Sequence, residues 1–146
     1  MNKTILITGI TGFVGSHLAD YINQNHPDKT ILGVKRWHLS KLDNIRHLLA
    51  ENKVELHDCD LTDPISVRNL IRATLPDVIF HCAAESFVSP SWDNPHRYMN
   101  ANYNATVNLL DSIKEFCAET KMLIPGSGEE YGEIKEDELP ITPETV

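Results

Sequence analysis

The sequence has 146 residues, of which 41% are hydrophobic and 23% are charged, and this is the composition of one folded globular domain. Its formal net charge of −8 argues against nucleic acid or an anionic membrane as the main partner. No apolar run approaches the roughly 18 residues of a membrane span, and a short apolar run before Thr8-Gly9 is not a signal peptide. The cysteines are isolated and no histidine pair has ligand spacing, so we expect a cytoplasmic protein without a metal site.

Short apolar runs alternate with segments of helical spacing along the chain. The apolar runs predict strands at residues 3–8, 30–35, 54–57, 77–81 and 121–124. The helical spacing predicts helices at residues 12–24, at 41–51, from Pro64 behind an Asp63 cap, and from about Pro95 to Ala118. The apolar positions assigned to the first and last of these helices are Val14, Leu18, Tyr21 and Ile22, and Val107, Leu110, Ile113 and Cys117.

This alternation predicts the fold class. Strands that alternate with helices form a parallel sheet with right-handed crossovers, so we expect an α/β, Rossmann-type doubly wound sheet with helices on both faces. The expected strand order is 3-2-1-4-5, and the expected ligand site lies at the carboxyl ends of the strands, where that order reverses. We expect one domain over residues 1–132, incomplete at its C-terminal side, and an extended acidic tail over residues 133–146.

A glycine-rich turn follows the first strand, at residues 8–15. Its spacing, G-x-x-G-x-x-G between a strand and a helix, favours a dinucleotide-phosphate site. Gly9 would allow a sharp turn, Gly12 a close approach of backbone to a pyrophosphate, and Gly15 close packing of the helix on the sheet. The residues assigned to cofactor binding here are Gly9, Thr11, Gly12, Phe13, Val14 and Gly15. The alternative is an ordinary strand-to-helix turn.

The end of the second strand indicates which dinucleotide is bound. An acidic residue there would bind the ribose hydroxyls of NAD, whereas this sequence has Lys35-Arg36. A guanidinium binds phosphate through two parallel hydrogen bonds, so Arg36 favours NADP, with NAD the weaker candidate. The alternative is an ordinary pair of surface cations.

Two further strand ends carry candidate cofactor residues. Asp60 could accept a hydrogen bond from the adenine amino group while Leu61 packs on the ring, although the segment could equally be a helix cap. Ala83, Ala84 and Ser86 follow the fourth strand, where small residues leave room for a cofactor, or simply pack tightly.

Asparagines are frequent in the last helix although they are poor helix formers. We expect Asn102 to be held by an internal hydrogen bond, and Asn100, Asn104 and Asn108 to face solvent.

The fifth strand ends in a loop that contains Ser127 and Glu129. A hydroxyl and a carboxylate at this edge of an α/β sheet lie where substrate chemistry takes place, so both are candidate catalytic residues. The alternative is a glycine-rich surface turn with solvated acids.

Together these positions resemble the extended short-chain dehydrogenase/reductase superfamily, which contains the nucleotide-sugar epimerases and dehydratases. The matching segments follow the order of the family's motifs: residues 8–15, 60–61, 82–88, 91–106 and 127–132. Within the superfamily, residues 33–45 and 129–142 are most similar to the GDP-mannose 4,6-dehydratases, which use NADP, and to their companion reductases.

The resemblance implies an activity: NADP-dependent dehydration of a nucleotide sugar of the GDP-mannose type. Hydride removal from C4 of the sugar acidifies the C5 proton, water leaves C6, and the hydride returns to C6. By position, Ser127 would hydrogen-bond the C4 oxygen and Glu129 would be the acid and base of the elimination.

The family's catalytic Tyr-x-x-x-Lys pair lies beyond this loop and is not found in the sequence. Tyr131 and Lys135 have the spacing, but they lie in the loop rather than on a helix, and we do not assign them this role. The chain is interpreted as the cofactor-binding portion of such an enzyme, inactive alone. The alternatives are a nucleotide-sugar reductase or epimerase, and a non-catalytic dinucleotide-binding module. The resemblance also implies that the whole enzyme is a homodimer.

Overall fold

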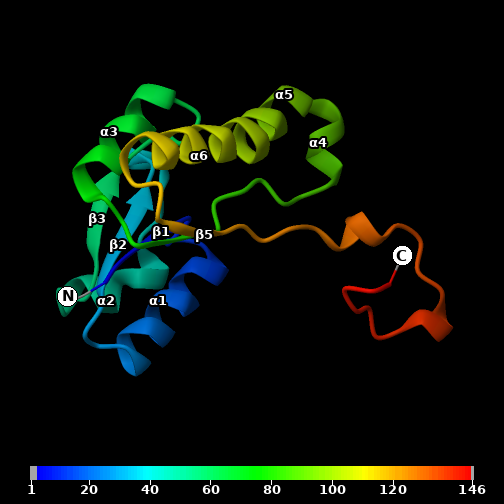
Figure 1. The fold of residues 1–146 in the computed structure, drawn as a ribbon, viewed down its shortest axis with the longest axis horizontal. Helices are drawn as coiled ribbons and strands as arrows, with labels where there is room; N and C mark the ends of the chain where they lie inside the picture. The colour runs from blue at the N-terminus through cyan, green and yellow to red at the C-terminus, as the bar shows by residue number, and fades with distance from the viewer. Residues whose placement is uncertain (1–2, 146) are drawn as a thin grey trace.

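The computed structural model describes residues 3–145 (Figure 1). The sheet is formed by β1 (Thr4–Thr8), β2 (Thr30–Lys35), β3 (Glu55–Asp58), β4 (Val78–His81) and β5 (Lys121–Leu123). The α-helices are α1 (Phe13–Asn25), α2 (Arg46–Ala50), α3 (Pro64–Thr74), α4 (Ser89–Asp93), α5 (Pro95–Tyr98) and α6 (Ala105–Phe116). A π-helical segment, Met99–Asn104, joins α5 to α6. Short 3₁₀ helices lie at Trp37–Leu39, Asp43–Ile45, Gly128–Tyr131 and Glu136–Glu138.

The strand order is β3-β2-β1-β4-β5 and every pairing is parallel, which confirms the predicted fold class and topology. The order reverses at β1, whose neighbours are β2 and β4. Thr8 at the end of β1 pairs with Val34 of β2 and with His81 of β4. The carboxyl ends of these three strands therefore meet at one edge of the sheet.

Alternation of side chains along the strands builds a core on each face of the sheet. Leu6 of β1 belongs to the core under α3 and α6, whereas Ile5 and Ile7 belong to the core under α1 and α2. Figure 1 shows these two helix pairs on opposite sides of the sheet. Leu6 and Ile7 are completely buried, and each contributes about 1.5–3 kcal/mol through burial. Both faces of the sheet must therefore be apolar.

The start of α3 has the cap and the proline that the sequence predicted. Asp63 is the N-cap, and its carboxylate accepts hydrogen bonds from the Ile65 and Ser66 amides at 3.1 and 3.2 Å. Pro64 occupies the first helical turn, where a missing N–H costs nothing.

Two predicted helices differ from the structure. The segment 41–51 contains only a 3₁₀ turn and the five-residue α2, in which Ile45 and Leu48 supply the buried contacts. The segment 95–118 is helical from Pro95 to Phe116, but it widens into π geometry at Met99–Asn104. Helical spacing alone does not distinguish these geometries, because it reports only which residues share a face.

The predicted inner faces of α1 and α6 are partly wrong. In α6 the buried residues include Leu109 and Ile113, whereas Leu110 is 45% exposed. In α1 Ile22 is buried as predicted, but Val14 and Tyr21 are exposed. Both helices carry apolar residues on more than one side, so spacing alone could not select the packed face.

The chain leaves the sheet after β5 and runs away from it (Figure 1). Residues 133–145 contain one 3₁₀ turn, Glu136–Glu138, and are otherwise irregular, while Val146 lies outside the described residues. Within residues 3–145, no helix has both the length and the apolar character that a bilayer crossing requires.

Candidate functional site

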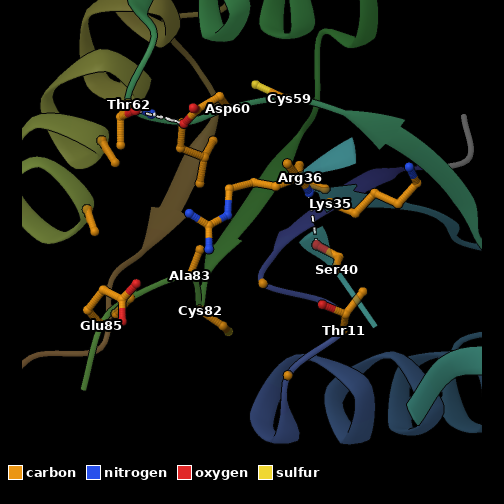
Figure 2. Close-up of a pocket in the computed structure, with 17 residues that line it drawn as sticks. Thr11, Lys35, Arg36, Ser40, Cys59, Asp60, Thr62, Cys82, Ala83 and Glu85 are labelled. Carbon is orange, nitrogen blue, oxygen red and sulfur yellow. Dashed lines mark hydrogen bonds between the residues drawn. The ribbon is translucent and has the colours of Figure 1, made fainter. Parts of the chain in front are cut away.

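A cavity of about 250 Å³ opens at the carboxyl ends of β1, β2, β3 and β4 (Figure 2). Its walls come from the loops after all four strands and from one side of the helical segment that ends in α6. The lining residues are Gly9, Thr11, Gly12, Val34, Lys35, Arg36, Ser40, Cys59, Asp60, Leu61, Thr62, Cys82, Ala83, Ala84, Glu85, Ala101 and Ala105. The cavity lies where the strand order reverses, as predicted for a ligand site in this architecture.

The glycine-rich turn is packed too tightly for side chains at two positions. Gly9 has φ +68°, and a Cβ there would lie 2.8 Å from the Ala83 nitrogen. A Cβ on Gly15 would lie 2.4 Å from the Gly9 carbonyl oxygen. Gly9 therefore lets the turn lie against the chain after β4, and Gly15 lets α1 lie against the turn.

The N-terminus of α1 has no side-chain cap. Gly12 is the N-cap, no cap hydrogen bond from a side chain is found within residues 3–145, and the first turn contains no acidic residue. The preceding loop is fixed by Asn44, whose Nδ2 donates to the Thr11 carbonyl oxygen at 2.9 Å. Uncapped amides at the positive end of a helix are suited to an anion such as a pyrophosphate.

The two cations after β2 have different surroundings. Lys35 forms an ion pair with Asp58, the residue it faces on β3. No ion pair within the described residues includes Arg36, and Figure 2 shows its side chain pointing into the cavity. The Arg36 amide donates to Ser40 Oγ at 3.0 Å, which folds the loop beside the guanidinium. Arg36 is thus the cation available to an anionic ligand.

The chain after β3 forms the far wall of the cavity. Asp60 Oδ1 accepts from both the amide and the hydroxyl of Thr62, at 2.9 and 2.8 Å, which leaves Oδ2 for a ligand. Leu61 is buried, and its carbonyl oxygen accepts from Asn108 Nδ2 at 2.9 Å. Asn108 is half-buried, so the expectation that it faces solvent is wrong.

The chain after β4 forms the opposite wall. Asn102 spans the backbone of Glu85: its Oδ1 accepts from the Glu85 amide at 2.8 Å and its Nδ2 donates to the Glu85 carbonyl at 3.0 Å. The Glu85 carboxylate also accepts from Arg97 of α5, at 2.6 and 3.0 Å. The predicted internal hydrogen bond of Asn102 is confirmed, and it fixes this wall to the π-helical segment.

Two thiols line the cavity, at Cys59 and Cys82. Burial raises the pKa of each thiol above its ordinary value of 9.0, so both are protonated at neutral pH. Neither thiol is therefore suited to act as a nucleophile.

Most of the residues assigned to the cofactor from sequence come together in this cavity. The assigned residues that line the cavity are Gly9, Thr11, Gly12, Arg36, Asp60, Leu61, Ala83 and Ala84. Phe13, Val14, Gly15 and Ser86 do not. The side chains of Phe13 and Val14 are exposed to solvent, and Gly15 is buried behind the turn.

Ser127 and Glu129 lie outside the cavity, on the segment that runs away from the sheet. Ser127 caps the 3₁₀ helix Gly128–Tyr131 by accepting from the Glu129 amide at 3.3 Å. Their catalytic assignment stays a prediction.

Sequence reasoning did not assign several lining residues to the cofactor. Among these residues are Lys35, Ser40, Cys59, Thr62, Cys82, Glu85, Ala101 and Ala105. The signal for Ser40 was its position four residues after Arg36, in a loop that the topology places at the ligand edge. Ala101 and Ala105 give no sequence signal, because alanine is common in any helix.

Comparison with known proteins identifies the family. The profile of the GDP-mannose 4,6 dehydratase family matches residues 6–146. The chain belongs to this family. A GDP-6-deoxy-D-mannose reductase from Pseudomonas aeruginosa is 30% identical over 146 residues, which is 100% of this chain and 41% of the relative. A UDP-glucose 4-epimerase from Mycoplasma genitalium is 33% identical over 129 residues, or 88% of this chain and 37% of the relative.

The fold agrees with solved structures of the same kind. A Thermus thermophilus UDP-glucose 4-epimerase in complex with NAD matches with a TM-score of 0.78 and 25% identity, over 91% of this chain and 40% of that chain. The chain thus spans about two fifths of the length of the relatives it matches. The matched part is the Rossmann-type sheet, and the fold assignment rests on the strand order as well as on this similarity.

Proposed function

We propose that this chain is the NADP-binding portion of a nucleotide-sugar dehydratase that acts on a sugar nucleotide of the GDP-mannose type. The observation that carries the proposal is the cavity at the strand ends of a chain that belongs to the GDP-mannose 4,6 dehydratase family. In that cavity an uncapped helix terminus and Arg36, which forms no ion pair with any residue that the structure describes, are available to two separate phosphates.

The residues present fit a nicotinamide dinucleotide. The turn at Gly9 and Gly12 and the first amides of α1 would bind the pyrophosphate, because these amides lie at the positive end of the helix and the N-cap, Gly12, has no side chain to bond to them. Asp60 Oδ2 and Leu61 would bind the adenine, and Ala83 leaves room beside the sheet edge. The matching Thermus thermophilus epimerase was solved with NAD, which supports a dinucleotide in this fold.

The choice of NADP rests on Arg36. NAD carries two free ribose hydroxyls at this position, and an acidic residue after β2 would bind them. Arg36 and the Ser40 hydroxyl instead offer hydrogen-bond donors, which suit a phosphate dianion. The neighbouring Lys35 is neutralised by Asp58 and contributes less.

The nicotinamide ring, when bound, supplies reversible hydride acceptance. The residues proposed for the proton steps are Ser127 and Glu129. The Ser127 hydroxyl hydrogen is available to the C4 oxygen of the sugar, because Ser127 Oγ acts as an acceptor in its own hydrogen bond. The exposed Glu129 carboxylate would remove the C5 proton and return a proton to the leaving hydroxyl.

A second candidate function is reduction or epimerisation of a related nucleotide sugar. The two relatives described above are named for these reactions. The residues around the cavity serve all three reactions equally, because each begins with cofactor binding.

The cofactor assignment is tested with Arg36→Ala in the 146-residue chain. NADPH should bind about 10- to 150-fold more weakly, the effect of a lost charged hydrogen bond of about 1.5–3 kcal/mol, and NADH affinity should be unchanged. Arg46→Ala is the matched control, since Arg46 is exposed and paired with Asp43 away from the cavity. An equal loss of affinity for NADPH and NADH would contradict the proposed role of Arg36 in binding the phosphate.

The reaction is tested in a polypeptide that joins this chain to the remaining length its relatives possess. GDP-mannose should yield a 4-keto-6-deoxy sugar nucleotide without added reductant, as shown by mass spectrometry of the products. Consumption of NADPH with a 4-keto substrate, and no dehydration of GDP-mannose, would favour the reductase.

A further inference from the structure

A chain of hydrogen bonds runs behind the cavity wall, through a histidine that does not line the cavity. His81 ends β4 and is 5% exposed. Its Nδ1 lies 2.7 Å from Thr8 Oγ1 of β1, and its Nε2 lies 3.2 Å from Thr106 Oγ1 of α6. Thr8 Oγ1 also accepts from the Ala83 amide at 3.2 Å, and Thr106 Oγ1 donates to the Asn102 carbonyl at 2.7 Å.

Counting hydrogens fixes the direction of this chain. The Thr106 hydroxyl donates its one hydrogen to the Asn102 carbonyl oxygen, so toward His81 it can only accept, from Nε2–H. The Ala83 amide donates to Thr8, whose own hydrogen then goes to the bare Nδ1 of His81. Every donor has an acceptor only when the imidazole is neutral and carries its hydrogen on Nε2.

The chain joins the two ends of one cavity wall. At one end it holds the Ala83 amide through Thr8. At the other it reaches Asn102, whose side chain holds the amide and carbonyl of Glu85. His81 is the link between them, because its two ring nitrogens are hydrogen-bonded to the two threonines, one to each.

We propose that neutral His81, as its Nε2–H tautomer, is a positioning residue that fixes the Ala83–Glu85 wall of the cofactor cavity between β1 and α6. The proposal deepens the proposed function, since the wall serves a cofactor there. His81 would hold this wall in place without contacting the ligand.

Protonation would break the chain at one point. With hydrogens on both nitrogens, the imidazolium would donate to Thr8 as well as to Thr106, and the Thr8 hydroxyl hydrogen would lose its acceptor. Among the described residues, the side chains hydrogen-bonded to His81 are two hydroxyls, that of Thr8 from β1 and that of Thr106 from α6. The titratable groups of the wall are Cys82 and the Glu85–Arg97 pair, and neither is bonded to the imidazole. Burial lowers the pKa of His81 below its ordinary 6.5, which keeps the ring neutral at physiological pH.

Nuclear magnetic resonance of the 146-residue chain tests this directly. The ring nitrogen spectrum of His81 should show the hydrogen on Nε2 at pH 7, and the midpoint of its protonation should lie below the ordinary histidine pKa of 6.5. The Ala83 and Glu85 amide resonances should shift in the same pH step. A hydrogen on Nδ1, or a ring titration that leaves both amides unchanged, would overturn the proposal.

Substitutions separate positioning from general stability. Thr106→Val should lower the hydrogen-exchange protection of the Glu85 amide about fivefold to tenfold. Thr74→Val is the matched control, because Thr74 also donates to a carbonyl one helical turn earlier, that of Leu70 at 2.8 Å. Equal loss of Glu85 protection in both variants would show only loosening of the fold and would contradict the proposal.

The His81→Asn variant connects the wall to the ligand. An asparagine can accept from Thr8 but cannot be protonated, so the pH step of the two amides should disappear. NADPH affinity should fall along the ring titration in the wild-type chain, and this component should be absent in His81→Asn. If the chain binds no NADPH at any pH, the proposed function fails for this chain, while the ring spectrum and the amide shifts still decide the positioning role.

Discussion

The substitution Gly15→Ala tests the packing of the glycine-rich turn. An added Cβ would lie 2.4 Å from the Gly9 carbonyl oxygen and 2.8 Å from Ile10 Cα, and real Cβ contacts are essentially never shorter than 3.0 Å. Both neighbours are backbone atoms, so they cannot rotate away. The helix α1 would have to move by at least 0.6 Å, the difference between 2.4 and 3.0 Å.

The cost follows from this displacement. Overpacking of a buried contact costs about 1–3 kcal/mol, while alanine in place of glycine within a helix returns about 0.5–1 kcal/mol. Because the neighbours are backbone atoms, the upper part of the overpacking range, about 2–3 kcal/mol, applies. We expect a net destabilisation of about 1–2.5 kcal/mol, which for a chain of this size lowers Tm by about 2–10 °C.

The assay is thermal unfolding of the 146-residue chain, with urea unfolding as a second measure. Gly128→Ala is the matched control, because a Cβ at Gly128 has no neighbour within 4 Å, and its stability should change by less than about 0.5 kcal/mol. An unchanged Tm in Gly15→Ala would refute the reasoning that close contact at this glycine sets the position of α1.

Three further predictions concern separate parts of the chain. Asp63→Ala should cost about 0.5–2 kcal/mol of unfolding free energy, because it removes the α3 cap, and Asp63→Asn should restore most of it in urea titrations. Burial lowers the pKa of His81 in the folded chain, so below pH 6.5 the unfolded chain binds more protons than the folded one. The stability that comes from neutral His81 should therefore be complete above pH 6.5 and be lost as the pH falls. A pH series of unfolding in which His81→Asn retains the whole loss would contradict this. In the longer enzyme, Glu129→Gln should abolish elimination from GDP-mannose and leave NADPH affinity unchanged; an active variant in a product assay would end the assignment of Glu129.

The sheet could be predicted because its signals are local. Each strand is a short apolar run between helices, and right-handed crossovers with the glycine turn after β1 leave few possible strand orders. Arg36 and Asp60 could be placed at the ligand edge for the same reason: Arg36 directly follows β2, and Asp60 lies two residues after the end of β3.

Side-chain pairing across the sheet could not be predicted to the same depth. Thr8 and His81 are 73 residues apart, and only the parallel register of β1 and β4 brings them together. The π-helical segment Met99–Asn104 was also missed, because apolar spacing does not report how wide a helical turn is. Asn102 was the exception, because a poor helix former within a helix indicates a side chain used for another purpose.

The most direct test of the central claim is a calorimetric titration of the 146-residue chain with NADPH and then with NADH. We expect NADPH to bind at least about tenfold more tightly than NADH, because Arg36 in the cavity wall would bind the additional phosphate. Equal affinity for the two dinucleotides, or binding of neither, would contradict the assignment of this cavity as an NADP site.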